Sequence, residues 1–453
     1  MNYNLKGNFK DIFRRLIKRD FSGNTGITVK NGIFQFSTTL FGKIGSLFFT
    51  AILARLLMPE LFGLYSLALS TITIFATFSE VGVDSTLTRF LSWEFGRKEE
   101  KRKARDYTIY LGRLKFFLSF ISVSVLIISA RFISDTYYQK PLFLALIAGA
   151  LYILAVGAAS FLRSILQASN YFKGVLYNEI IFQVVRLIVI PLLILFSLKH
   201  LFSNEKVLFF IILGLGISYL ASLIFSWFSH RRKFEYLMEE GEKISPSEKR
   251  RVNRFIIPAA ATVITTIFFG SVDMVMLGRF VLSQYIGYYR AAFTLVAALT
   301  SLISFSVVLL PIFSRLKKQQ LEIGFKKAVS MTVLSSAVLF LFVFLFAPLL
   351  IHIIYGNLYE PAINLLRVFS LILISTPLLS IYISYFAARE KPAIVTKRLI
   401  YSLIVNIFLN VIAILLLKNY GDLAMVYGVT GATIISNWFY LFGLIINKKR
   451  KFK

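Results

Sequence analysis

Long apolar runs alternate along this chain with short segments that are polar and mostly basic. About 20 apolar residues form a helix that crosses the hydrocarbon core of a bilayer, so each long run predicts a membrane-spanning helix. Because most connections are short, consecutive helices are expected to be antiparallel neighbours. The twelve runs cover roughly residues 33–57, 62–83, 107–130, 142–163, 180–198, 207–227, 255–277, 288–312, 328–354, 361–386, 399–417 and 423–446.

The basic residues follow the same alternation. Of the 51 lysines and arginines, 38 fall in the segment before the first run, in the even-numbered connections and in the C-terminal tail, whereas 8 fall in the other connections. Cytoplasmic loops of membrane proteins carry such an excess of positive charge. The pattern therefore predicts a multi-pass protein of the cell (cytoplasmic) membrane whose two termini are both cytoplasmic.

Two basic segments divide the chain. Residues 1–32 carry apolar residues at helical spacing with lysines and arginines between them. This predicts a cytoplasmic amphipathic arm on the anionic inner membrane surface, with a solvated basic arm as the alternative. The longest internal connection, also basic, separates the first six runs from the last six. The predicted organisation is an N-terminal six-helix bundle at 33–227, a cytoplasmic linker at 228–254, a C-terminal six-helix bundle at 255–446 and a basic tail at 447–453.

A short motif occurs once in each predicted bundle. ARLLM at residues 54–58 and GLY at 63–65 recur, at a constant offset of 224, as GRFVL at 278–282 and GYY at 287–289. Chance similarity between two apolar hairpins is the alternative to an internal repeat. Six helices per repeat would give both halves one orientation, related by a pseudo-two-fold axis along the membrane normal. The identical pairs are Arg55 and Arg279, Gly63 and Gly287, Tyr65 and Tyr289, and Ala68 and Ala292.

Composition excludes several classes of function. Hydrophobic residues make up 57% and charged residues 16% of the chain, against about 45–50% and 25% in soluble domains, which excludes a soluble enzyme. The net charge of +29 lies in tracts between apolar runs, which favours membrane orientation over nucleic-acid binding. There is no cysteine, no phosphate-binding loop and no Ser/His/Asp arrangement. We therefore expect no enzyme activity, metal or cofactor, and leave coupling to the membrane potential or an ion gradient open.

Charged residues at membrane depth are the candidate binding residues. An ionised side chain at the midplane costs about 2.5–3.5 kcal/mol on insertion scales, so it normally faces protein or water. Lys43, near the middle of the first run, is expected to line a central cavity, with pairing to an acid such as Asp273 as the alternative. Arg186 is expected either to contact a ligand or to pair with Glu179, seven residues earlier on the same helix face.

Three further arginines and the acid Asp273 complete the candidate set for the cavity. Arg55 and Arg279 lie at the outer junctions of the two repeats, and Arg367 lies near the outer end of the tenth run, facing either the cavity or the interface. Fixed positive charges at membrane depth outnumber the acids there, which favours an anionic passenger carried between the two bundles. Those acids are Glu80, Asp84, Glu179 and Asp273.

Two stretches of the chain resemble a known family. AILARLLMP at 51–59 is followed by FGLY at 62–65 and GVDSTLTRF at 82–90, and VDMVMLG at 272–278 is followed by IGYYRAA at 286–292. They resemble the first hairpin and the seventh helix of oligosaccharide (polysaccharide) flippases of the Wzx/RfbX type. That family lies within the multidrug/oligosaccharidyl-lipid/polysaccharide exporter superfamily. Lys43 matches a position where lipid-II flippases of this superfamily carry a cavity arginine.

The resemblance implies an all-α integral membrane protein with two pseudo-symmetric six-helix bundles, arranged like those of MATE transporters as a V around a central cavity. It also implies translocation of polyprenyl- or dolichyl-(di)phosphate-linked oligosaccharide from the cytoplasmic to the outer leaflet by alternating access, for surface polysaccharide or glycoprotein glycans. The alternatives are a multidrug/toxin exporter of this fold and a lipid-II flippase. The expected partners are the lipid-linked sugar, anionic membrane lipids, and a glycan polymerase or glycosyltransferases of the same pathway.

Overall fold

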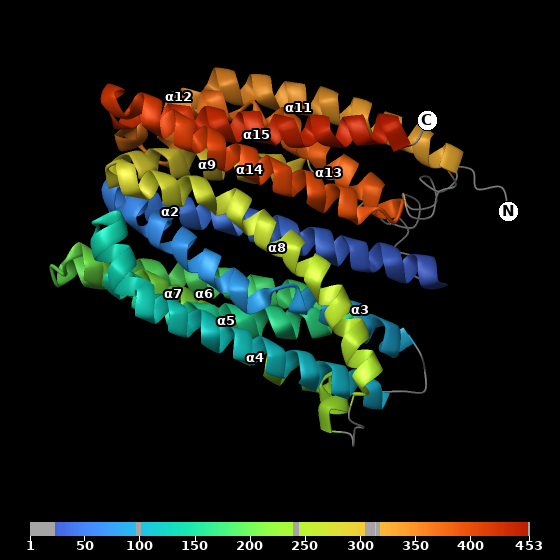
Figure 1. Cartoon of the computed structure of the whole chain (residues 1–453). Helices are drawn as coiled ribbons and strands as arrows, with labels where there is room; N and C mark the ends of the chain where they lie inside the picture. Colours follow the sequence, from blue (N-terminus) through green and yellow to red (C-terminus); the bar gives the residue numbers. More distant parts are fainter. Residues whose placement is uncertain (1–22, 97–100, 239–243, 304–312, 314–317, 452–453) are drawn as a thin grey trace.

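The computed structural model describes residues 23–96, 101–238, 244–303, 313 and 318–451, and within these ranges it contains helices and no strand (Figure 1). Most of the predicted amphipathic arm lies outside the described residues, and residues 23–32 of its predicted range form the start of the first helix. The helices are α2 (Gly23–Glu80), α3 (Val83–Gly96), α4 (Lys101–Arg131), α5 (Phe143–Ala168), α6 (Phe172–Lys199), α7 (Asn204–Ser229), α8 (Pro246–Phe280), α9 (Ser283–Leu302), α11 (Lys318–Ile354), α12 (Ala362–Phe369), α13 (Ile372–Ala388), α14 (Pro392–Leu417) and α15 (Asp422–Lys451). Short π or 3₁₀ turns are η1 (Phe132–Tyr138), η2 (Arg231–Lys233), η3 (Glu235–Met238), η4 (Asn357–Tyr359) and η5 (Lys418–Tyr420).

Helix α2 is a hairpin of two antiparallel segments. Met58 has φ 59° and ψ 169°, which no helix accommodates, and Pro59 follows it. Proline disfavours helical dihedrals in the preceding residue and is well suited to the first turn of a helix, so the chain turns back here without a loop. The first and second predicted spans are therefore both contained in this element (Figure 1).

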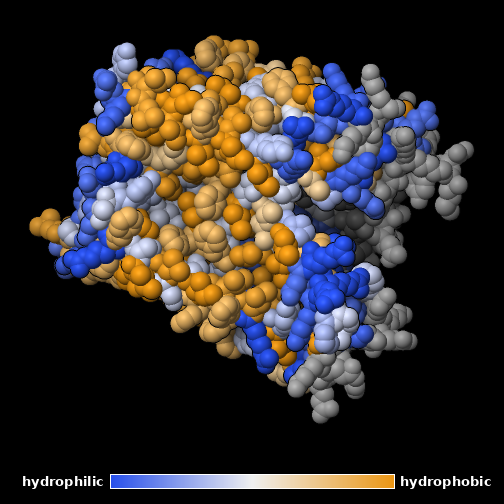
Figure 2. All heavy atoms as spheres, viewed as in Figure 1, coloured by the Kyte–Doolittle hydropathy of each residue, from blue (hydrophilic) through white to orange (hydrophobic). Residues whose placement is uncertain are grey.

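Ten helices of the described residues are long and apolar enough to cross a membrane, one of them the folded segment Lys30–Gly96. The exact count of twelve spans stays a prediction. Figure 2 shows a broad apolar band across the face in view, with hydrophilic residues toward both ends. Large exposed apolar side chains, such as Phe116 of α4, Leu334 of α11 and Leu415 of α14, belong to lipid-facing helices.

Both described chain ends lie at one end of the molecule, because α2 begins and α15 ends there (right in Figure 1). We call this the terminal end and the other the far end. Helix α8 starts at the terminal end, nine residues before the predicted seventh span, because Ser245 and Glu248 form a capping box ahead of Pro246. From there α8 crosses diagonally from the first group of helices, where it packs on α3, to the second, where it packs on α14 and α15.

Three hydrophobic clusters determine how the two groups of helices meet. At the far end one continuous cluster joins them, with Phe62 of α2 and Tyr289 of α9 among its members. At the terminal end one cluster, including Phe90, joins the first group to the start of α8, which contributes Val252 and Ile256, and the second group has another cluster, including Tyr385. Apart from the start of α8, which packs on the first group, apolar burial therefore joins the two groups at the far end. The result is a V of two bundles, as the family resemblance implied, whose described helices diverge toward the terminal end (Figure 1).

A central cavity and the contact that closes it

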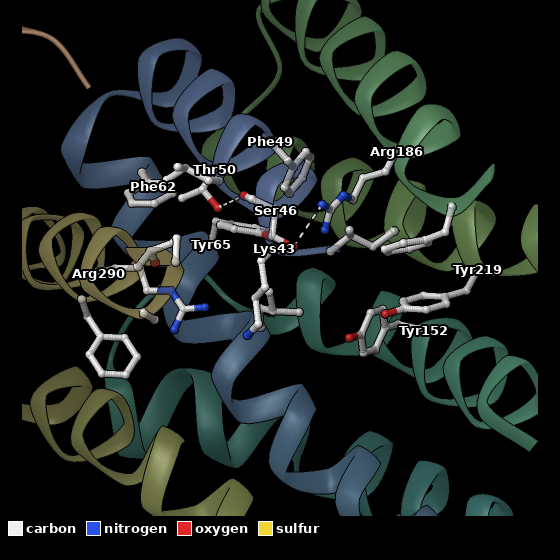
Figure 3. A pocket seen from close by; sticks show the side chains of 18 residues that line it. Lys43, Ser46, Phe49, Thr50, Phe62, Tyr65, Tyr152, Arg186, Tyr219 and Arg290 are labelled. Atoms are coloured by element: carbon white, nitrogen blue, oxygen red, sulfur yellow. Dashed lines mark hydrogen bonds between the residues drawn. The ribbon is translucent and has the colours of Figure 1, made fainter. Parts of the chain in front are cut away.

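A cavity of about 280 Å³ lies where the two groups of helices meet. Helices α2, α5, α6 and α7 form one wall and α9 forms the other. Tyr65, Tyr152, Tyr219 and Thr50 place hydroxyl groups along it, interleaved with phenylalanine rings. Figure 3 shows the charged groups of Lys43, Arg186 and Arg290 directed into this space from α2, α6 and α9.

Arg186 is held rigidly in the cavity wall. It is only 7% exposed, and its guanidinium lies 4.3 Å from the ring centre of Phe49 and 4.9 Å from that of Phe182, a geometry typical of cation–π contacts. One terminal nitrogen donates to the Gln183 side-chain oxygen and, at 3.4 Å, to Ser46 Oγ. Its Nε has no hydrogen-bond partner among the described residues. A planar guanidinium held in this way is well suited to an anionic oxygen.

Lys43 and Arg290 supply two further positive charges. Among the described residues no carboxylate forms an ion pair with either. Sequence reasoning placed Lys43 in the cavity but did not select Arg290, which lies at the very start of the predicted run 288–312. Helix α9 begins at Ser283, five residues before the predicted span, so Arg290 is already two turns inside the helix. The one sequence feature that indicated the earlier start of α9 was Ser283, the first residue of its polar first turn.

A second cavity of about 320 Å³ adjoins the first on the side of the terminal end. We call it the vestibule. It lies between α2, α5, α6 and α7 and shares five wall residues with the central cavity: Lys43, Ser46, Phe182, Arg186 and Tyr219. Its other walls are polar, with the side chains of Gln35, Thr38, Thr39 and Gln167. Its acid, Glu179, is paired with Arg163 at 3.0 Å. Both cavities together reach the size range of small-molecule sites, roughly 300–1,000 Å³.

At the far end, the two repeats meet through their glycines. A Cβ added at Gly63 would lie 1.8 Å from the Ser283 carbonyl oxygen, and one added at Gly287 would lie 2.2 Å from that of Pro59. Residues 63 and 287, like residues 59 and 283, are separated by the repeat offset of 224. Such reciprocal contacts are what a two-fold axis between two copies requires. The backbones of α2 and α9 therefore touch directly across the pseudo-two-fold axis and seal the cavity there.

Two cations of the first group bind helix C-termini of the second group beside this contact. Arg55 donates from Nε to the Ile354 carbonyl at 3.0 Å and from a terminal nitrogen to the Ile353 carbonyl, at the end of α11. Lys140 donates to the Gly278 carbonyl at 2.8 Å, at the end of α8. Positive charge is stabilised at a helix C-terminus by the unsatisfied carbonyls and the helix dipole. Arg55 is thus part of the far-end closure and does not line either cavity.

The remaining predicted site residues also lie outside the cavities. Asp273, 4% exposed, sits among the helices of the second group, where it accepts hydrogen bonds from Tyr289, Thr433 and Asn410 at 2.8, 2.6 and 2.7 Å. Asp273 therefore neither lines a cavity nor pairs with Lys43, which was the alternative role for that lysine.

Arg279 lies at the far-end surface. There it lines a separate pocket with Lys140 and Asp422, and burial lowers the pKa of Lys140 below its ordinary value. Arg367 of α12 donates to Asn364 at 3.0 Å. Charge and depth identified these arginines, but side-chain direction, which the sequence does not give, excludes them from the cavity wall.

The model of the polysaccharide biosynthesis protein family matches residues 28–317, which is more than half of the chain. The chain belongs to this family. The resemblance to Wzx-type flippases is thereby confirmed, and the coarser function follows: a flippase or transporter of lipid-linked substrates in the membrane. No curated protein matches the chain.

Solved structures show the same fold. The lipid II flippase MurJ, in an inward closed conformation, superposes with a TM-score of 0.72 at 17% identity, over 92% of this chain and 87% of MurJ. An inward-facing multidrug resistance MATE family transporter of the MOP superfamily gives 0.59 at 14%, over 93% and 96%. A MOP superfamily transporter from Pyrococcus furiosus, described as having a binding pocket of reversed polarity, gives 0.53 at 14%, over 93% and 95%. These relatives are transporters and flippases rather than enzymes.

Proposed function

We propose that this protein flips a polyprenyl- or dolichyl-linked oligosaccharide from the cytoplasmic to the outer leaflet by alternating access. The observation that carries the proposal is the central cavity, in which three cations from both bundles converge within walls rich in hydroxyl groups. A phosphate linkage between lipid and sugar is the part of such a substrate that three cations would bind. The terminal end, where the described helices of the two bundles diverge (Figure 1), is then the cytoplasmic side.

The polar vestibule would bind the sugar part of this substrate. Moving sugar hydroxyls through hydrocarbon without partners would cost several kcal/mol per group. Gln35, Thr38 and Thr39 offer oxygen acceptors there, and the stacked rings of Phe182 and Tyr219, 4.1 Å apart, offer an apolar face. Thr38 and Thr39 donate their hydroxyl hydrogens to backbone carbonyls, so their oxygens are free to accept from a sugar. The lipid tail remains in the bilayer throughout.

Transport then follows from the geometry of the closure. Separating the glycine contact at the far end while closing the V at the terminal end would expose the same three cations to the outer leaflet. Two negative charges moving outward across an inside-negative membrane gain about 4.6 kcal/mol per 100 mV. The membrane potential can therefore drive the step that carries the phosphate.

The test is flipping of a fluorescent lipid-linked saccharide in proteoliposomes, read by loss of signal to a membrane-impermeant quencher. We expect flipping by the wild-type protein and at least a tenfold loss, about 1.4 kcal/mol, when Arg186 or Arg290 is replaced by glutamine. Wild-type protein that flips no lipid-linked saccharide, or variants that flip it normally, would refute the proposal. Export of cationic dyes instead would favour the multidrug alternative. We consider that alternative weaker because the described walls of the two cavities contain one carboxylate, Glu179, and it is paired.

A further inference from the structure

Four side chains form one hydrogen-bonded ladder along the vestibule wall. Arg163 donates to Glu179 Oε2 at 3.0 Å, Gln183 donates from Nε2 to Glu179 Oε1 at 2.7 Å, and Arg186 donates to Gln183 Oε1. Glu179, Gln183 and Arg186 lie at positions i, i+4 and i+7 of α6 and so share one face. Each is at most 8% exposed. The charges along the ladder therefore run positive, negative, neutral, positive.

Two glycines of the neighbouring helix α2 leave room for this ladder. A Cβ at Gly42 of α2 would lie 3.0 Å from Glu179 Oε1, and a Cβ at Gly45 would lie 2.5 Å from Gln183 Oε1. The Gly42 carbonyl also accepts from Gln183 Nε2 at 3.3 Å. Any larger residue at Gly45 would displace the amide, so these two glycines fix where Gln183 lies.

Only one orientation of the Gln183 amide satisfies both neighbours. Its NH₂ group must face the carboxylate, which only accepts, and its oxygen must face the guanidinium, which only donates. The amide thus separates the negative charge of Glu179 from Arg186. A direct Glu179–Arg186 pair would neutralise the charge that the cavity presents, since an ion pair satisfies both partners at once.

We propose that Gln183 is the positioning residue that keeps Arg186 available to the phosphate of the substrate. It holds the guanidinium by its oxygen and keeps the only vestibule carboxylate of the described residues turned toward Arg163. The proposal rests on the proposed function, because it assumes that the cavity binds an anion. It adds that one neutral side chain, rather than the number of cations alone, determines the charge selectivity of the site.

The decisive experiment exchanges the two residues without changing the net charge. The double variant Glu179→Gln with Gln183→Glu has the same charge as the wild type but places the carboxylate beside Arg186. The probes are farnesyl diphosphate, a short isoprenoid with two phosphates, and farnesol, the same tail without them. Binding to the purified full-length protein is measured by calorimetry. We expect the exchange to weaken farnesyl diphosphate binding about tenfold or more, and to leave farnesol binding unchanged.

A second pair of variants keeps the test decisive if the exchanged protein does not fold. Gly45→Ala pushes on the Gln183 oxygen and changes no charge, whereas Gly32→Ala, in the same helix, meets nothing within 4 Å. We expect Gly45→Ala to weaken farnesyl diphosphate binding several-fold relative to Gly32→Ala. The control Gly32→Ala should keep the melting temperature of the wild-type protein.

The outcomes separate this proposal from the proposed function. Wild-type protein that binds farnesyl diphosphate no better than farnesol would overturn both. Wild-type protein that prefers farnesyl diphosphate, together with an exchanged variant or Gly45→Ala that binds it equally well, would overturn only the role of Gln183.

Discussion

Replacing Gly63 by alanine should open the far end of the protein. The added Cβ would lie 1.8 Å from the Ser283 carbonyl oxygen and 2.9 Å from the Gly287 nitrogen, both of which are backbone atoms of the opposite bundle. A carbon normally approaches a carbonyl oxygen to about 3.3 Å, so α2 and α9 must separate by about 1.5 Å. Neither partner is a flexible side chain that could move aside.

The size of the effect follows from this clash. Overpacking of a tight contact typically costs about 1–3 kcal/mol, and the clash exists only while the far end is closed. Any gain in helix propensity from alanine applies to both states and cancels. The equilibrium between closed and open far ends should therefore shift by roughly 5- to 150-fold toward the open state.

The shift can be measured with a single cysteine, because the chain contains none. Thr294 lines the central cavity, and its hydroxyl has no hydrogen-bond partner among the described residues, so Thr294→Cys loses no such contact. A membrane-impermeant maleimide, added on the side of the far end, reaches this cysteine only when the far end is open. Labelling should be faster in Gly63→Ala than in the parent protein.

The matched control is Gly270→Ala in α8, where an added Cβ meets nothing within 4 Å. It makes the same chemical change in a membrane helix without the clash, and should label at the parental rate. Equal labelling of Gly63→Ala and this control, at equal amounts of folded protein, would show that the glycine contact does not hold the far end closed.

Three further predictions concern charged groups. Arg55→Ala and Lys140→Ala should each raise the same labelling, but less than the glycine variant, because a cation at an exposed helix C-terminus contributes about 0.3–1 kcal/mol; no change in labelling would refute a closing role. Lys115 is buried and lies 2.5 Å from Asp84, so Lys115→Met should destabilise the protein by about 3–5 kcal/mol because it leaves the carboxylate unpaired. Adding Asp84→Asn should recover most of this loss, as measured by thermal unfolding. A double variant no more stable than Lys115→Met would contradict this. Lys43→Arg should retain flipping of a lipid-linked saccharide, Lys43→Ala should weaken it strongly, and normal flipping by Lys43→Glu would exclude a contact with the phosphate.

Much of the fold could be predicted from the sequence because apolar length and basic connections are properties of the chain alone. Helix boundaries were less accurate: α8 begins at Pro246 and α9 at Ser283, both ahead of the apolar runs that identified them. Polar first turns such as the Ser245 capping box extend helices beyond the hydrocarbon core. The hydropathy pattern does not contain this information.

The candidate site could be predicted only in part, for a related reason. The sequence gives the depth of a charged residue in the membrane but not the direction of its side chain. Lys43 and Arg186 were found because they are deep and lie on helices that border the cavity. Arg55, equally prominent in the sequence, reaches across to α11 instead, and that contact joins residues 299 positions apart. The repeat indicated Gly63 and Gly287 as a pair, but not that they touch.

The division of the apolar core has a consequence for the transport cycle of an empty carrier. The two clusters at the terminal end share no side chains across the V except those that the start of α8 packs on the first group, whereas opening the far end must split a single cluster that both bundles build. Splitting that cluster loses packing between buried side chains, whichever medium fills the gap. Under the proposed function the two halves of the cycle are therefore unequal: the empty carrier would favour the state that loads, and bound substrate, or the field acting on it, would bring it to the state that releases. The position of the shared hydrophobic cluster would thus determine the resting conformation of the carrier.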